Sequence, residues 1–114
     1  MKKPNNAERL RHILDAVERI ERYLQGFEKQ NFQTDEKTQD AVVRQMEIIG
    51  EAATSLTWDL RTNNPQVAWE FAASMLIRLI HGYFDVDADI VWNTTQSDLP
   101  ILKKQIEEIL ENLS

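Results

Sequence analysis

The chain has 114 residues, 42% of them hydrophobic and 28% charged, and a formal net charge of −6. This composition is typical of a folded globular protein, and the length fits one domain over residues 1–114. The absence of cysteine excludes a disulfide scaffold and thiolate metal sites. The acidic balance excludes a protein whose whole surface binds nucleic acid, because phosphate contacts need clustered Lys and Arg. It leaves RNA cleavage at one local site possible.

Helix-forming residues dominate the rest of the composition. Only three glycines and three prolines are present, so little of the chain suits β-turns, and the fold class is predicted to be all-α. The N-terminal run 1–6 is polar, and no apolar stretch approaches the roughly 18 residues that span a bilayer. We therefore expect a cytoplasmic protein that has no membrane contact.

The first two helices follow from apolar spacing. One stripe at three- and four-residue steps predicts a helix from about Asn6 to Gln25, and the polar run 30–33 predicts a loop after Gly26. Thr34 or Asp35 then suits the cap of a second helix. Gly50, in the middle of that helix, is expected to let another helix approach closely.

The third helix is predicted to begin at Pro65, after the loop 61–65, and to end near His81 and Gly82. It is apolar around much of its circumference, so we expect it to be the most buried helix. Its apolar surface exceeds what one small bundle covers easily. The sequence therefore predicts a homodimer whose interface includes this helix.

The last part of the chain is predicted to hold two helices. The run 85–87 can cap a short helix over Ile90–Trp92, residues 97–100 interrupt it, and Pro100 suits the first turn of a final helix. The whole pattern predicts an antiparallel four-helix up-and-down bundle with an extra short helix.

Three chemically capable side chains lie together at the end of the predicted third helix: Arg78, His81 and Tyr83. Residues 78 and 81 lie about 60° apart around a helix, so both can share one face. The alternative is structural, with His81 interacting with the negative end of the helix dipole and Tyr83 packing as an aromatic residue.

Other candidate sites carry less weight. We interpret His12 as a surface or boundary residue of the first helix. Glu47 and Glu51 have the one-turn spacing of carboxylate metal sites, but no Glu-x-x-His pair accompanies them. Asp85, Asp87 and Asp89 lack the other features of a calcium loop, so helix capping explains them better. We expect no metal and no cofactor.

The chain from Leu79 to Pro100 resembles the HEPN class, and specifically its HepT-like branch. The matching residues are Leu79-Ile80-His81-Gly82-Tyr83-Phe84, Val86-Asp87, Ile90-Val91-Trp92 and Asp98-Leu99-Pro100. Upstream, Arg44, Glu47 and Ile49-Gly50-Glu51-Ala52 are similar to the family's second-helix pattern, so the resemblance extends over essentially the whole chain.

The resemblance implies a homodimer of helical bundles in which the signature histidines meet in a cleft between the subunits. It implies a metal-independent ribonuclease toxin of a type VII-like toxin–antitoxin system, acting on transfer RNA or messenger RNA. Its partner would be a minimal nucleotidyltransferase antitoxin that attaches AMP to the signature tyrosine. Carried over to this sequence, His81 is the catalytic histidine and Tyr83 the modified tyrosine.

The sequence departs from the family at one place. Leu76 and Ile77 occupy the positions of the family's arginine and asparagine, and Arg78 is the candidate substitute. Removing one donor to transition-state charge typically costs on the order of a hundredfold in rate, so weak activity or none is expected. The alternative function is a catalytically silent HEPN dimer that acts as a binding partner or nucleotide-sensing scaffold.

Overall fold

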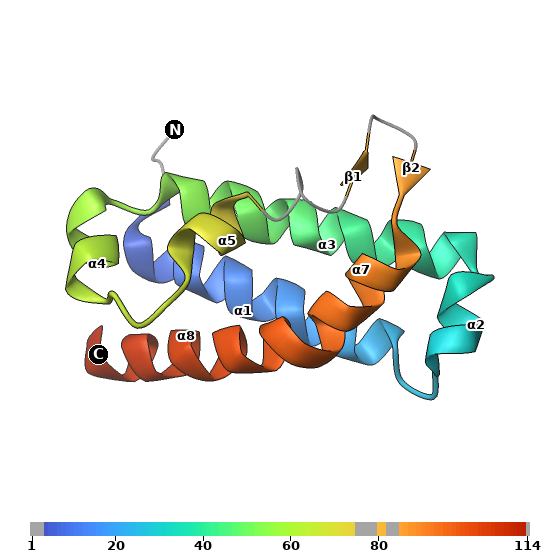
Figure 1. Cartoon of the computed structure of the whole chain (residues 1–114). Helices are drawn as coiled ribbons and strands as arrows, with labels where there is room; N and C mark the ends of the chain where they lie inside the picture. The colour runs from blue at the N-terminus through green and yellow to red at the C-terminus, as the bar shows by residue number, and fades with distance from the viewer. Residues whose placement is uncertain (1–3, 75–79, 82–84, 114) are drawn as a thin grey trace.

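Three long helices form the body of the fold in the computed structural model, which describes residues 4–74, 80–81 and 85–113. The elements in chain order are α1 (Asn6–Tyr23), α2 (Lys29–Gln33), α3 (Glu36–Ser55), α4 (Trp58–Asn63), α5 (Trp69–Ala73), β1 (Ile80–His81), β2 (Asp85–Val86), α7 (Ala88–Asn93), the π-helical segment η1 (Thr94–Asp98) and α8 (Leu99–Leu113). Figure 1 shows α1 running antiparallel to α3 and α8, with both ends of the chain at one end of the bundle. The predicted all-helical fold class is confirmed.

The core lies where α1 packs against α3 and α8. The predicted apolar stripes supply the fully buried side chains of Leu10, Ile13, Val42, Met46, Ile49 and Ile106, and Phe32 joins them from outside those stripes. At the edge of this core Lys103 of α8 donates a hydrogen bond to Glu21 of α1 at 2.9 Å. This hydrogen bond raises the pKa of the Lys103 ammonium group.

Local signals set the ends of α1 and α3. The Asn5 side chain accepts a hydrogen bond from the backbone N–H of Glu8 at 2.8 Å, which caps α1. Gly26 follows α1 with a φ of 81°, a conformation that glycine adopts without strain. Asp35 caps α3 by accepting from the N–H of Thr38 at 3.0 Å, as predicted.

The close approach predicted at Gly50 is confirmed, and its partner is α5. A Cβ atom at this position would lie 3.4 Å from the carbonyl oxygen of Ala73 and 3.6 Å from that of Ala72. The backbone of α5 therefore rests on the middle of α3, where a larger side chain would push the two helices apart.

The predicted loop at residues 30–33 and the first part of the predicted loop at 61–65 belong to short helices. Residues 29–33 form α2, because Phe32 is fully buried and the N–H of Glu28 donates to Asn31 Oδ1 at 3.3 Å. Residues 58–63 form α4, whose first turn is closed by a hydrogen bond from the N–H of Leu60 to Thr57 Oγ1 at 3.4 Å. In both, one buried apolar side chain lies within a polar stretch that lacks a long periodic pattern.

The third predicted helix was wrong at both ends. Pro65 lies in a turn closed by a bond from the N–H of Val67 to the carbonyl oxygen of Asn64 at 3.3 Å, and α5 begins only at Trp69. Proline fixes a φ that suits the second position of a turn as well as the first turn of a helix. At the other end, Ile80 and His81 are extended and pair with residues 85–86.

The final helices follow each other without a loop. Residues 94–98 form η1, in which the N–H of Leu99 donates to the carbonyl oxygen of Thr94, five residues back. Pro100 has no N–H to offer to residue 96, and the wider π turn accommodates this loss just before α8. The predicted interruption at residues 97–100 is therefore a change of helix type, and Pro100 lies in the first turn of α8 as predicted.

No helix within the described ranges is both long enough and apolar enough to cross a membrane.

The core should be sensitive to the loss of one branched side chain. We expect Ile13→Ala to lower the free energy of unfolding by about 2–5 kcal/mol, because Ile13 is fully buried in the packed core. Urea unfolding followed by circular dichroism measures this. Ile101→Ala is the matched control, since Ile101 is 61% exposed and its loss should change stability by less than about 1 kcal/mol.

Candidate active site

The predicted catalytic histidine lies in a two-stranded antiparallel pair. In the register of β1 and β2, Ile80 is opposite Val86 and His81 is opposite Asp85. Figure 1 shows this pair beside the body of the bundle, just ahead of α7 in the chain. The other predicted site residues, Arg78 and Tyr83, and the departures at 76 and 77 lie outside the described residues.

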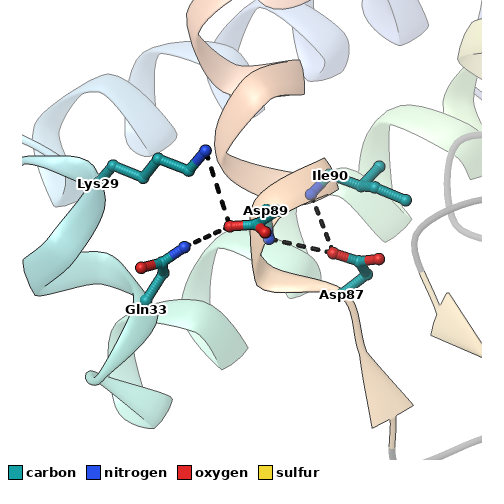
Figure 2. A network of polar contacts seen from close by, with 5 residues as sticks. All are labelled: Lys29, Gln33, Asp87, Asp89 and Ile90. Carbon is teal, nitrogen blue, oxygen red and sulfur yellow. Dashed lines mark hydrogen bonds and ion pairs between the residues drawn. The ribbon is translucent and has the colours of Figure 1, made fainter.

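The start of α7 is fixed by Asp87, one residue after β2. Its carboxylate accepts hydrogen bonds from the N–H groups of Asp89 at 3.1 Å and Ile90 at 3.2 Å (Figure 2). The capping role predicted for this segment is confirmed. Because the cap sets where the extended chain turns into a helix, it also sets where β2, and with it the strand that holds His81, leaves the bundle.

A second contact joins the same turn to α2. Asp89 accepts a hydrogen bond from the Gln33 side chain and lies 3.8 Å from the Lys29 ammonium group (Figure 2). The Lys29 and Asp89 side chains are about half exposed, so this ion pair alone contributes little to stability. The apolar part of the junction is the packing of Phe32 on Trp92, whose ring centroids lie 5.5 Å apart.

Sequence reasoning missed this junction because it assigned residues 30–33 to a loop. The available signal was Phe32, an aromatic residue within a polar run, together with Glu28 and Asn31 at the spacing of a capping box. The partner across the junction, Asp89, is 56 residues from Gln33 in the chain, and no local pattern connects the two.

The remaining candidates do not form a site. Glu47 accepts a hydrogen bond from Arg44 at 2.7 Å, so its carboxylate already has a cationic partner. Glu51 is exposed one turn further along α3, and His12 is exposed on α1. Across the ranges that the structure describes, no group of three or more His, Asp or Glu side chains is arranged to hold a metal ion.

The sequence that runs from β2 into α7 is acidic. Asp85, Asp87 and Asp89 alternate along this segment, and Lys29 is the cation that contacts its described end. A phosphate group gains little from this surface, since acidic side chains repel it. Any group that stabilises phosphate near His81 must come from elsewhere in the chain or from a second protein.

A comparison with known families decides which family this chain belongs to. The model of the family described as "Ribonuclease HepT-like" matches residues 13–109, which is most of the described fold. The chain belongs to the HepT-like ribonuclease family. The resemblance recognised in the sequence is thereby confirmed, and the general activity it implies, ribonuclease, is the activity of the family.

Relatives of this HepT-like chain cover nearly its whole length. A protein of Thermococcus cleftensis named as a probable ribonuclease HepT is 37% identical over 107 residues, which are 94% of this chain and 97% of that protein. A protein of Caldanaerobacter subterraneus subsp. tengcongensis, whose name gives RNase as its expected activity, is 38% identical over 90% of this chain and 91% of its own length. No solved structure matches the chain.

One relative is longer. A protein of Methanocaldococcus jannaschii, whose name joins gamma-glutamylcyclotransferase with RNase, is 39% identical over 104 residues. The match covers 91% of this chain but 47% of that protein, so the HepT-like chain corresponds to about half of it.

The cap of α7 can be tested by a matched pair of substitutions. We expect Asp87→Ala to lower the free energy of unfolding by about 0.5–2 kcal/mol, because two N–H groups lose their acceptor. Asp59→Ala is the control, since Asp59 is an exposed acid in the first turn of another six-residue helix, α4, whose cap is Thr57. Equal effects of the two changes in urea unfolding would show that the cap has no special role.

Proposed function

We propose that this HepT-like protein is the toxin subunit of a type VII-like toxin–antitoxin system and a metal-independent endonuclease of transfer RNA or messenger RNA. The observation that carries the proposal is membership of the HepT-like ribonuclease family together with the signature His81-Gly82-Tyr83 in this chain. The active site would be composite, with one His81 from each subunit of a homodimer.

The chemistry needs two proton transfers and no metal. The 2′-hydroxyl oxygen of RNA attacks the adjacent phosphorus while the bond from phosphorus to the 5′ oxygen breaks. The products are a 2′,3′-cyclic phosphate and a free 5′-hydroxyl group. One neutral imidazole takes the proton of the 2′-hydroxyl, and one protonated imidazole gives a proton to the leaving 5′ oxygen. Two His81 residues in one dimer cleft would supply both.

The negative charge that develops on the phosphate needs a cationic donor at this site. A guanidinium group suits the developing charge because it donates two parallel hydrogen bonds. The family's arginine is Leu76 here, and Arg78 is the nearest candidate to replace it. We propose His81 as the catalytic residue and Arg78 as its substitute partner.

Modification of Tyr83 would control the toxin. A minimal nucleotidyltransferase antitoxin would present ATP, the tyrosine oxygen would attack the α-phosphorus, and pyrophosphate would leave. The AMP group adds negative charge two residues from His81, which repels the RNA phosphate and blocks the cleft.

A second function is favoured by one observation. Leu76 and Ile77 remove two polar side chains that the family pattern carries, while His81, Gly82 and Tyr83 remain. A chain that keeps the modified tyrosine but lacks the phosphate ligand would act as a silent HEPN dimer, a binding partner or a nucleotide-sensing scaffold.

Restoring the family residues separates the two functions. We expect Leu76→Arg with Ile77→Asn to raise the rate of RNA cleavage by about a hundredfold or more, because a donor to the developing phosphate charge returns. Gel analysis of total RNA after incubation measures the rate. Adding His81→Ala should remove the gain, since proton transfer is still required.

The restored protein must also fold and dimerise, which circular dichroism melts and sedimentation establish. If it does both and cuts RNA no faster than the parent, the parent is tested with Arg78→Ala. A loss of parent cleavage then assigns the role to Arg78, and no cleavage by any of these proteins contradicts the nuclease function.

The modification of Tyr83 has a direct mass readout. Incubation with the nucleotidyltransferase encoded beside this gene and with ATP should increase the mass of the chain in steps of AMP. Tyr83→Phe should stay unmodified, because it lacks the accepting oxygen, while Tyr23→Phe serves as the control at the other tyrosine of the chain. Equal modification of Tyr83→Phe and the parent would contradict the assignment.

A further inference from the structure

The structure holds a cleft between α4 and α5 that the predicted active site does not use. It is shallow and widely open to solvent, with a volume of about 700 Å³. Its lining includes Trp58, Arg61, Pro65, Glu70 and Phe71. In Figure 1, α4 lies at the end of the bundle that holds the chain termini, while the β1–β2 pair lies towards the end that holds α2.

Trp58 is the most unusual residue of this cleft. Its side chain is 71% exposed, the highest value among the large apolar residues described as exposed. The other tryptophan of the cleft, Trp69, is 8% exposed, and its indole N–H donates to the carbonyl oxygen of Asn64 at 2.9 Å. Trp69 therefore serves the fold, whereas most of the surface of Trp58 is free to contact a ligand.

Arg61 adds an unused donor beside this ring. It lies three residues after Trp58 on α4, so both side chains point to one side of the helix. Its Nε atom is buried and has no hydrogen-bond partner within the described residues. Because the Nε atom itself is buried, a ligand in the cleft would be held by the terminal nitrogens of this half-buried side chain.

The combination of Trp58 and Arg61 suits the binding of a nucleobase better than the binding of another protein. Among the large apolar residues that are exposed in the described part of the chain, Trp58 alone lines the cleft; Phe71 is half-buried, and Val67 and Trp69 are buried. This leaves far less apolar surface than the roughly 800 Å² per partner of a stable protein interface. An exposed indole beside a guanidinium group is instead how proteins commonly bind unpaired RNA bases. The carboxylate of Glu70 disfavours a run of phosphates, so the cleft suits one base.

We propose that the cleft between α4 and α5 binds one unpaired base of single-stranded RNA, with Trp58 stacking on the base and Arg61 donating to the phosphate that flanks it. This inference rests on the proposed function, since it assigns an anchoring site for the RNA that His81 would cut. It also names the substrate class as RNA with an unpaired base at a distance from the cleavage point.

The test measures RNA binding in a protein that cannot cut. His81→Ala is the background for every variant, and the probe is a fluorescent single-stranded RNA of 12 nucleotides. Anisotropy titrations at several salt concentrations give the dissociation constant and its salt dependence.

Trp58→Ala should weaken binding by about 5- to 150-fold and leave the salt dependence unchanged, because stacking releases no counterions. Trp58→Phe should keep most of the affinity. Arg61→Gln should reduce the slope of log affinity against log salt by about 0.7, the value for one phosphate contact in a single strand. Leu113→Ala, which removes another exposed apolar side chain, is the matched control and should change neither quantity.

A duplex of the same sequence gives a second control, since its bases are stacked inside the helix and cannot reach Trp58. The proposal is overturned if Trp58→Ala binds the single strand as the parent does, or if it weakens single strand and duplex alike. It is also overturned if Trp58→Ala changes only the sedimentation of the protein, which would make the cleft a contact between protein chains.

The outcomes for the cleft and for the nuclease can be told apart. If the protein with His81 intact cuts RNA but Trp58→Ala binds normally, only the cleft assignment fails. If Trp58→Ala loses binding but no variant with His81 cuts RNA, the cleft stands and the nuclease function fails.

Discussion

The packing of α1 between α3 and α8 is the constraint on which the rest of the fold depends. Each of these helices buries one apolar stripe, and the stripe of α1 meets both neighbours. The segment between α3 and α8 must therefore return along the outside of this core. It does so as α5, the β1–β2 pair and α7 (Figure 1). The described residue of the proposed site, His81, lies on this returning segment.

The returning segment is fastened to the core near its two ends. At one end α5 rests on α3 at Gly50, where a Cβ atom would already lie in van der Waals contact with the backbone of α5. At the other end Phe32 packs on Trp92, and Asp89 contacts α2. The strand of His81 lies between these two anchors. Such an arrangement holds the backbone on either side of a site while the site itself can carry residues chosen for chemistry.

The negative charge of this chain opposes the binding of RNA, which a ribonuclease must bind. The net charge of −6 and the acids around α7 repel RNA, and the family's arginine is a leucine at position 76. Binding through stacking on Trp58 needs few cations, because it draws on apolar contact with a base. An acidic HepT-like protein could therefore hold RNA at a distance from its catalytic residues. The two proposals together would place RNA binding at one end of the bundle and RNA cleavage nearer the other.

Much of the fold could be read from the sequence because it depends on neighbours in the chain. The apolar stripe of α1, the caps at Asp35 and Asp87, and the place of Pro100 each follow from residues within one or two helical turns. The family, and with it His81, was recognisable from a run of adjacent residues. The tertiary structure decided the rest. Residues 29–33 form a helix because Phe32 is buried in the core. His81 pairs with Asp85 in an extended strand, where the sequence had predicted helix. Asp89 meets Gln33 across 56 residues, and such contacts form only when distant segments have packed together, which no local pattern encodes.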